Sequence, residues 1–462
     1  MPTEVGRLRT DRRGQRRSYC DMPTLTFPLS RIEGHARVVI EVQGGEVISA
    51  HFEAMEIRGF GYFVQGVPAE QMPVIVPRIC GVCSTAHHVA SVEALEDAYD
   101  VTPPPLANTI RELLMLGQLI QNQATSVFLF TMPDRLGTTS IFESMGEANS
   151  ERDRAVLATQ ALKVRKAGTD LISLSGGQFI HPIKATVGGV TSGIPPEPAT
   201  EMRRQIAEAL PIACRLFDWY WDKSIALRDR IGTWGDDQPA YYISATSDTC
   251  PNYDGQPGQD VIRVLDPTGS DCEAFAACDF REVLTFEETD YSYAGRSSYR
   301  DDVMRANSLA RINMTRTLGT PRAEGYLTRF RETFGQPAHA ILLFDLGRGI
   351  ELVYALERAM EILKEPLDGR QTAVAHTPRD GEGYGLVEAP RGPLIHHYRI
   401  ENDVIAEAEF IIPTVHNTKA IERALNVAAR RYVTPERIDM ELEHAVGRVV
   451  RAFDPCIACA TH

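Results

Sequence analysis

The chain ends in DPCIACATH at residues 454–462, and an earlier stretch, RICGVC at residues 78–83, has the same Cys-x-x-C spacing. Chain ends usually fray in solvent, yet this one carries two thiols and an imidazole. Four thiolates in two such pairs suit a soft or borderline metal. We therefore expect the fold to bring the N- and C-terminal cysteine motifs together at its core, around one metal site.

The spacing of the cysteines does not by itself decide which metal is bound. Two Cys-x-x-C pairs are typical of a tetrahedral zinc site, so the spacing alone favours a zinc clasp that joins the two ends. The pairs of zinc ribbons, however, usually lie about 15–20 residues apart, far closer than here. A thioredoxin-like redox site is less consistent, because a second pair would be redundant and neither pair follows a βαβ unit.

The composition is ordinary for a soluble globular protein, with 43% hydrophobic and 24% charged residues in 462. A formal net charge of −14 argues against nucleic-acid binding, which needs a basic face. No apolar run reaches the roughly 20 residues of a membrane span. The nine cysteines are too few for a disulfide framework and odd in number, so we expect a reducing, cytoplasmic compartment.

The first 24 residues stand apart from the rest. Residues 1–24 are rich in arginine, and no apolar region follows them, so they do not resemble an export signal. We expect a disordered basic arm, or a start site placed too early, since Met22 opens a second plausible beginning.

The remaining chain predicts an α+β fold that is mostly helical, with a central bundle of long helices and small peripheral β-sheets. Alternating apolar and polar residues indicate two β-hairpins, turning at Gly44–Gly45 and at Asn402–Asp403. A helix should follow the first cysteine pair, beginning near Ser84 or Thr85. Long helical patterns occupy residues 106–130, 151–174, 198–232, 341–365, 418–433 and 435–453, and the first of these is apolar on most sides and should be buried. Short strands separated by Gly, Pro and Asp indicate a loosely structured peripheral insertion at residues 238–298.

Three further motifs distinguish this site from a closed zinc clasp. They are SRIEGH at residues 30–35, VEAPRG at residues 387–392 and IIPTVHN at residues 411–417. A zinc clasp needs neither an acid nor an arginine beside it. Taken with both cysteine motifs, the chain resembles the large, catalytic subunit of nickel–iron hydrogenases, and most of all the cytoplasmic, cofactor-linked members. The resemblance covers residues 25–462, which we expect to form one hydrogenase large-subunit domain.

The resemblance implies a set of metal ligands. Cys80 and Cys456 would be terminal ligands of nickel, while Cys83 and Cys459 would bridge nickel and an iron that carries carbon monoxide and cyanide. The reaction would be the reversible oxidation of dihydrogen to protons and electrons. Glu33 matches the family's proton-shuttling glutamate and would take up the proton released at Cys456.

Other residues would surround this centre by the same resemblance. His87 would donate a hydrogen bond to the bridging sulfur of Cys83, whereas we expect His88 to be an ordinary core or surface histidine. Arg391 would lie over the open metal position, near the ligands of the iron. Residues with supporting roles would be Thr414, as a donor to a cyanide, and Pro390 and Leu394, as an apolar collar.

The sequence departs from the family pattern at two places. Many relatives carry a magnesium-binding Glu where this chain has Gly61. Glu56 or water would take its place here, with the Phe410 carbonyl and His462 completing the protein ligands. Relatives also often place Asp-His or Ser-His where this chain has Asn122–Gln123. A carboxylate partner for Arg391 must then come from elsewhere, and Asp454 is a candidate.

Electrons must leave such a centre through iron–sulfur clusters, and the five other cysteines lack cluster spacing. The resemblance therefore implies an iron–sulfur small subunit, and we favour coupling to NAD(P) through diaphorase-type flavin and iron–sulfur subunits. The alternatives are ferredoxin, heterodisulfide reductase or a deazaflavin, and more remotely a non-catalytic, zinc-clasped scaffold. Nickel-insertion proteins and an endopeptidase that cuts after the motif's histidine are also implied. An end at His462 is what the matured subunit would show.

Overall fold

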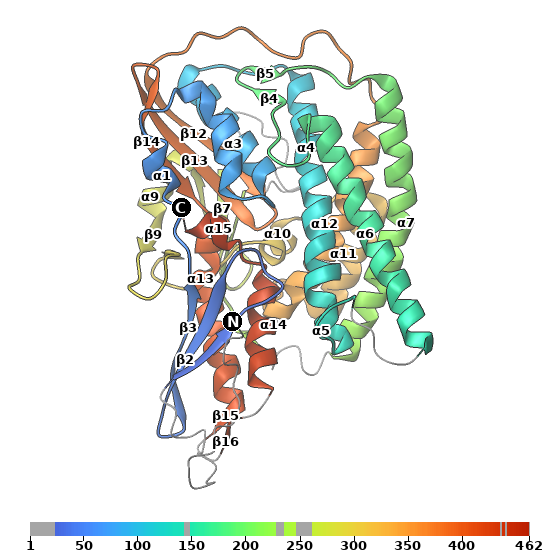
Figure 1. Ribbon diagram of the computed structural model, residues 1–462, viewed down its shortest axis with the longest axis vertical. Helices are drawn as coiled ribbons and strands as arrows, with labels where there is room; N and C mark the ends of the chain where they lie inside the picture. Colours follow the sequence, from blue (N-terminus) through green and yellow to red (C-terminus); the bar gives the residue numbers. More distant parts are fainter. Residues whose placement is uncertain are drawn as a thin grey trace, which may run out of the picture.

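Long helices stand side by side and form one half of the molecule (Figure 1). The computed structural model describes residues 24–142, 148–227, 235–245, 261–434, 437–438 and 441–461. The bundle consists of α4 (Pro105–Ala124), α6 (Ala148–Gly176), α7 (Pro196–Ala226), α11 (Pro321–Phe334) and α12 (Phe344–Ile362). Most side chains of α4 are buried, because α6 and α12 both pack against it. This arrangement confirms the predicted bundle and its buried first helix.

Two antiparallel sheets lie in the other half of the molecule (Figure 1). The first consists of β1 (Thr24–Pro28), β2 (Ala36–Gln43) and β3 (Glu46–Ala54), and the second of β12 (Gly381–Ala389), β13 (Gly392–Glu401) and β14 (Val404–Ile411). Both expected hairpins are present. Each turns through two residues with positive φ, 61° and 81° at Gly44 and Gly45 and 52° and 62° at Asn402 and Asp403, as such tight turns require.

The range 238–298 contains the short strands that its sequence indicated, although residues 246–260 lie outside the described part. These elements are β6 (Tyr241–Ser244), β7 (Val261–Leu265), β8 (Asp271–Ala276), α9 (Phe280–Val283), β9 (Leu284–Glu287) and most of β10 (Arg296–Tyr299). Strands β6, β7 and β8 form one sheet with β11 (Met304–Arg305). Their apolar side chains share a second core with Leu386, Ile395 and Ile411, so they support the sheet formed by β12 to β14.

The helix that follows the first cysteine pair is held directly against that sheet. Helix α3 (Ser84–Tyr99) packs on β12. At Gly383 and Gly385 the contact is so close that a Cβ atom would lie 2.1 Å from the Ala94 carbonyl oxygen and 2.0 Å from that of Ala90. Glycine is required here because the helix backbone occupies the space of a side chain.

The C-terminal segment runs back into the interior. Helix α13 (Pro413–Tyr432) packs on α14 (Leu442–Phe453), which leads to the short α15 (Ile457–Ala460) between the sheets and the bundle (Figure 1). Every residue from Ala452 to Thr461 is buried. The two cysteine motifs therefore meet at the core, as predicted.

Smaller elements connect these parts of the described chain. They include α1 (Phe60–Phe63), α2 (Met72–Ile75), the π-helical η4 (Thr125–Thr131) that continues α4, α5 (Met132–Leu136), β4 (Ala185–Thr186), β5 (Gly189–Val190), α10 (Ser308–Met314), β15 (Val433–Thr434) and β16 (Arg437–Ile438). Within the described ranges, no helix combines the length and apolar character needed to cross a membrane.

Candidate metal centre

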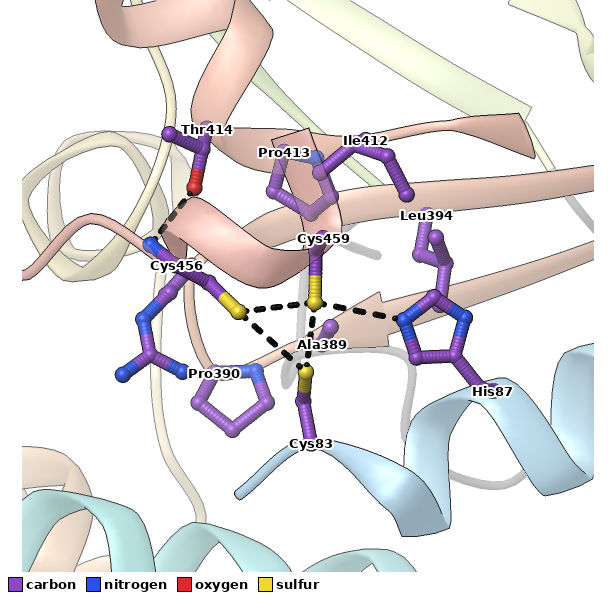
Figure 2. A pocket seen from close by; sticks show the side chains of 11 residues that line it. Cys83, His87, Ala389, Pro390, Leu394, Ile412, Pro413, Thr414, Cys456 and Cys459 are labelled. Atoms are coloured by element: carbon purple, nitrogen blue, oxygen red, sulfur yellow. Dashed lines mark hydrogen bonds between the residues drawn. The ribbon is translucent and has the colours of Figure 1, made fainter. Parts of the chain in front are cut away.

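The sulfurs of both cysteine pairs form one buried group. The Sγ atoms of Cys80, Cys83, Cys456 and Cys459 all lie within 4.8 Å of one another. The Sγ of Cys459 is 2.9 Å from that of Cys83 and 2.7 Å from that of Cys456, and Figure 2 shows these three converging. The Sγ of Cys456 is 3.3 Å from that of Cys80. None of the four takes part in a disulfide.

The first pair is placed by the beginning of a helix. Cys80 follows a short 3-10 helix, and its own backbone is extended. Its sulfur faces the main-chain N–H groups of Val82 and Cys83 at 3.3 and 3.4 Å. Cys83 is the N-cap residue of α3, one residue before the cap expected at Ser84 or Thr85. Unpaired N–H groups at a helix N-terminus favour a thiolate.

The second pair is placed by contacts from distant parts of the chain. Asp454 ends α14 with φ 48°, which turns the backbone towards the other sulfurs. The main-chain N–H of Cys456 then donates to Oγ1 of Thr414 at 3.0 Å. The N–H groups of Ile457 and Ala458 donate to Glu33, at its main-chain oxygen (3.3 Å) and its Oε2 (3.0 Å).

Glu33 therefore reaches the metal site, as the sequence predicted. Its carboxyl group also hydrogen-bonds the side chain of Cys456. Burial, and after it the charge of Cys80, raises the pKa of Glu33 above its ordinary value. A partly buried carboxyl with a raised pKa, in contact with a sulfur, can exchange a proton with that sulfur.

Arg391 lies at the site in the turn between β12 and β13. Its Nη2 donates to Oδ1 of Asp454 at 3.1 Å, and its Nε donates to the main-chain oxygen of the same residue. Asp454 is thus the carboxylate partner, and Nδ2 of Asn122 donates to its Oδ2 at 3.2 Å. Within the described part of the chain, Nη1 of Arg391 is buried with no hydrogen-bond partner.

A small cavity of ≈ 20 Å³ lies beside three of the sulfurs (Figure 2). It is lined by Cys83, His87, Ala389, Pro390, Arg391, Leu394, Ile412, Pro413, Thr414, Cys456 and Cys459. Pro390, Leu394 and Thr414 were expected there. Ala389, Ile412 and Pro413 were not, although they lie within the same two motifs. The cavity thus has apolar walls with the polar side chains of His87, Arg391 and Thr414 among them. The Thr414 hydroxyl accepts from the N–H of Cys456 and keeps its own proton to donate.

The two adjacent histidines of α3 differ in environment. Nε2 of His87 lies 3.4 Å from the sulfur of Cys459 (Figure 2), whereas the sequence placed this contact on Cys83. A long side chain on a helix is directed towards the preceding turn, and α15 brings the sulfur of Cys459 to that point. His88 bonds the Pro73 carbonyl at 2.8 Å, and burial lowers its pKa to about 4. It is a core histidine, as expected.

The expected magnesium ligands stay a prediction. Glu56 is partly exposed and contacts Nδ1 of His35 at 2.6 Å. Phe410 is buried in β14, and His462 lies outside the described residues. The residue before it is anchored, since the Thr461 carbonyl accepts from the N–H of Arg58 at 2.7 Å.

The electrostatics of the sulfur group call for a cation. Burial raises the pKa values of Cys83, Cys456 and Cys459, whereas hydrogen bonds from the other three sulfurs lower that of Cys80. Four adjacent thiolates would repel one another strongly in so dry a site. Four sulfur donors select soft or borderline metals, so the residues present fit such a centre.

A buried group of four cysteine sulfurs, flanked by a carboxyl and a guanidinium, is suited to hold a soft or borderline metal with a proton carrier beside it. Residues 58–134 and 246–462 match the family described as nickel-dependent hydrogenase, and residues 27–57 match one described as HoxL-like. The chain belongs to the nickel-dependent hydrogenase family, as a catalytic subunit.

Individual relatives agree with this assignment. The chain is 31% identical to a subunit of the F420-non-reducing hydrogenase of Methanothermobacter thermautotrophicus, over 94% of this chain and 93% of that one. It is 29% identical to the beta subunit of the NAD-reducing hydrogenase HoxS of Cupriavidus necator, with the same coverage of both chains. Its fold matches an NAD+-reducing [NiFe]-hydrogenase in the H2-reduced state with TM-score 0.86 and 27% identity, over 96% of this chain and 100% of that one.

Proposed function

We propose that this chain carries a nickel–iron centre and delivers the electrons of dihydrogen, through an iron–sulfur small subunit, to NAD(P). The observation that carries the proposal is the convergence of both cysteine pairs, Glu33 and Arg391 on one buried site. When bound, a nickel–iron centre supplies the heterolysis of dihydrogen. Cys80 and Cys456 would hold the nickel, and Cys83 and Cys459 would hold both metals.

The cavity beside the sulfurs fits small diatomic ligands on the iron. Carbon monoxide needs only apolar contact, which Pro390 and Leu394 offer. A cyanide nitrogen accepts hydrogen bonds, and the cavity has two donors for it, Nη1 of Arg391 and the hydroxyl of Thr414. Such outer contacts tune the electron density at a metal.

Glu33 would move the proton. Its carboxyl group hydrogen-bonds the side chain of Cys456, so it is placed to accept a proton released at that sulfur. Its bonds from Ala458 and Ile457 hold it in place without taking part in the transfer. Asp454, another carboxylate at the described site, is already paired with Arg391.

Mg²⁺ beside the C-terminus is part of the same proposal. Glu56, the Phe410 carbonyl and His462 would be its protein ligands, with water completing the octahedral shell that this ion prefers. Glu56 would have to leave His35 to reach the ion. Magnesium analysis of wild-type protein and of a Glu56→Gln variant tests this assignment.

The small subunit would carry the iron–sulfur clusters. Among the described residues, the four cysteines form the one group of three or more possible metal ligands, so a cluster site is not found beside it there. An apolar surface suited to a partner lies on the segment that bonds Thr461, where Ile57, Tyr62 and Phe63 are 66%, 82% and 54% exposed. Nickel-insertion proteins, a maturation endopeptidase and a cytoplasmic location complete the proposal.

The choice of NAD(P) as acceptor is supported by the NAD-reducing relative and by the high TM-score with an NAD+-reducing enzyme. A second candidate is an acceptor other than NAD(P), such as ferredoxin or heterodisulfide reductase, and the slightly greater identity to F420-non-reducing subunits, whose names do not mention NAD, favours it. The names of those relatives argue against a deazaflavin acceptor.

Isolation of the native complex tests both levels of the proposal. Metal analysis of this subunit, separated from the complex, should give nickel and iron in equal amounts, whereas zinc alone would contradict the metal centre and restore the clasp. Infrared spectra should contain the stretching bands of iron-bound carbon monoxide and cyanide. Reduction of NAD+ or NADP+ under hydrogen, compared with reduction of ferredoxin and of a deazaflavin, then decides the acceptor.

A further inference from the structure

A fully buried arginine, Arg311 of α10, clamps the turn that carries Arg391. The turn consists of two residues, Pro390 and Arg391, because Ala389 pairs with Gly392 across β12 and β13. Arg311 donates from Nη1 to the carbonyl of Ala389 at 3.2 Å and from Nη2 to that of Pro390 at 2.8 Å. Both main-chain oxygens that lead into Arg391 are thus held by one side chain.

Arg311 is itself fixed by two carboxylates. Its Nε and Nη2 donate to Glu351 of α12 at 2.6 and 2.9 Å, and its Nη1 donates to Glu388 of β12 at 2.6 Å. All three residues are 0% exposed. These bonds and the two carbonyl bonds use all five N–H groups of the guanidinium, so its plane has one orientation.

A second arm reaches the side chain of Arg391. Nε2 of Gln123 donates to Oε2 of Glu351 at 2.5 Å, and Nδ2 of Asn122 lies 3.3 Å from the Oε1 of Gln123 and 3.2 Å from Oδ2 of Asp454. Asp454 in turn accepts from Arg391. The amides of the Asn–Gln pair therefore join the carboxylate at Arg311 to the carboxylate at Arg391. The backbone between Pro390 and Arg391 closes this series of hydrogen bonds into a ring.

The charges of the ring explain why its links are amides. Two buried guanidinium groups face three carboxylates, those of Glu351, Glu388 and Asp454. Burial raises the pKa of Glu388, so a further acid here would face a strong desolvation penalty. Neutral amides supply donors to two carboxylates and add no charge.

We infer that Arg311 and the Asn122–Gln123 pair are positioning residues that fix the direction of the Arg391 guanidinium and keep its Nη1 directed into the cavity. The inference deepens the proposed function and rests on it. Arg311 acts on the backbone of the turn, and the amide pair acts on the side chain through Asp454. Neither touches the sulfurs.

Arg311→Lys tests the first arm, because lysine keeps the charge and loses the planar fork. The matched control is Arg111→Lys. Arg111 is also 0% exposed, is bidentate to Glu96 and bonds the carbonyls of Thr186 and Gly189, but it holds the β4–β5 turn. Purified holoenzymes would be compared for nickel content, infrared bands of the iron-bound diatomic ligands, and kcat and KM for hydrogen.

We expect Arg311→Lys to retain nickel, to shift or broaden the cyanide bands, and to lower kcat by about 10- to 100-fold, the usual loss for an outer hydrogen-bond partner of a metal site. Arg111→Lys should leave bands and kcat unchanged. If both variants had the same bands and the same kcat, the inference would be overturned, while the proposed function would stand. A wild-type holoenzyme with neither nickel nor diatomic bands would instead refute the proposed function on which it rests.

Asn122→Leu tests the second arm and serves if Arg311→Lys does not fold. It removes the donor to Asp454 at similar volume, and Asn108→Leu, on the same helix and also buried, is its control. The same shift of the cyanide bands, with a smaller loss of kcat, is expected for Asn122→Leu only. Unchanged bands in a nickel-loaded Asn122→Leu enzyme would show that the amide pair does not position Arg391.

Discussion

The two cysteine pairs have the same spacing but are held in place by different means. Cys80 and Cys83 lie at the beginning of α3, and that helix is locked on β12 at Gly383 and Gly385. Cys456 lies before a helix of four residues; Thr414 holds its own main-chain N–H, and Glu33 holds that of Ala458. The first pair is therefore preformed by its own helix, whereas the second depends on residues far away in the sequence.

The dependence of the second pair extends to the backbone of the N-terminal segment. Gly34 has φ 79°, and a Cβ there would lie 2.7 Å from the Cβ of Ile457. The terminal segment thus packs directly against Glu33 and Gly34. The residue that we propose as proton carrier is also a structural anchor, and variants of Glu33 have to be chosen so that the two roles separate.

The largest effect is expected from removing a sulfur of the second pair. Cys456→Ser takes away one nickel ligand and one contact of Glu33, while α14 and the sheets keep their cores. Hydrogen turnover should be abolished and the thermal unfolding midpoint should change little. Normal hydrogen uptake with a full complement of nickel would show that this sulfur is not a ligand.

Glu33→Gln and Glu33→Ala separate proton transfer from anchoring. The glutamine oxygen can still accept from the N–H of Ala458, but the amide cannot carry a proton. We expect Glu33→Gln to keep its nickel and lose about 10²- to 10⁴-fold in turnover, the usual range for a general acid–base group. Glu33→Ala should also bind less nickel, because the second pair loses the side-chain bond to Ala458 and keeps only the main-chain bond to Ile457.

Two measurements on each variant separate the roles. Exchange of deuterium gas with solvent protons reports proton transfer, and nickel content reports anchoring of the second pair. Exchange at the wild-type rate in Glu33→Gln would mean that another group carries the proton. Equal nickel in both variants would mean that Glu33 does not anchor the second pair.

The sequence predicted those parts of the site whose residues lie inside short motifs. The meeting of the cysteines, the approach of Glu33 to Cys456 and the pairing of Arg391 with Asp454 were all expected, and each is present. The hairpins and the buried helix were also predictable, since turn residues and apolar periodicity are local signals.

The sequence could not predict contacts that depend on how distant elements are placed. His87 faces Cys459 and not Cys83 because the packing of α15 decides which sulfur lies at that turn of α3. The partners of Arg311 come from α12 and β12, and no spacing links them. The sequence predicted a loosely structured insertion at residues 238–298, because the core that its strands share with β12 to β14 forms only in the folded chain.

A smaller effect is expected where the first pair is preformed. Gly385→Ala would press a Cβ on the Ala90 carbonyl oxygen, so α3 must shift with Cys83 at its beginning. Such overpacking typically costs about 1–3 kcal/mol, which should lower the thermal unfolding midpoint and the nickel content. Gly325→Ala is the control, because nothing lies within 4 Å of a Cβ there and α11 should be slightly stabilised. Similar midpoints for both variants would show that the close contact does not position the first pair.

The smallest effect is expected from pH, which should change the unfolding free energy through one buried histidine near each cysteine pair. His88 lies on α3 with the first pair, and His416 lies on α13, two residues after Thr414, where its Nδ1 is 2.8 Å from Oγ of Ser297. Burial lowers the pKa of each to about 4, so both stay neutral in the folded protein. In the unfolded chain they take up protons near the ordinary value of 6.5, so the unfolding free energy is complete above that pH and falls as the pH decreases towards 4. The slope should be on the order of 1 kcal/mol per pH unit for each histidine.

Replacing either one by Asn, which cannot be protonated, should flatten the decline between pH 6.5 and 5, before most carboxylates titrate. If the unfolding midpoint of both variants fell as steeply with pH as that of the wild type, the acid sensitivity would come from other groups, and the two sides of the site would not share it.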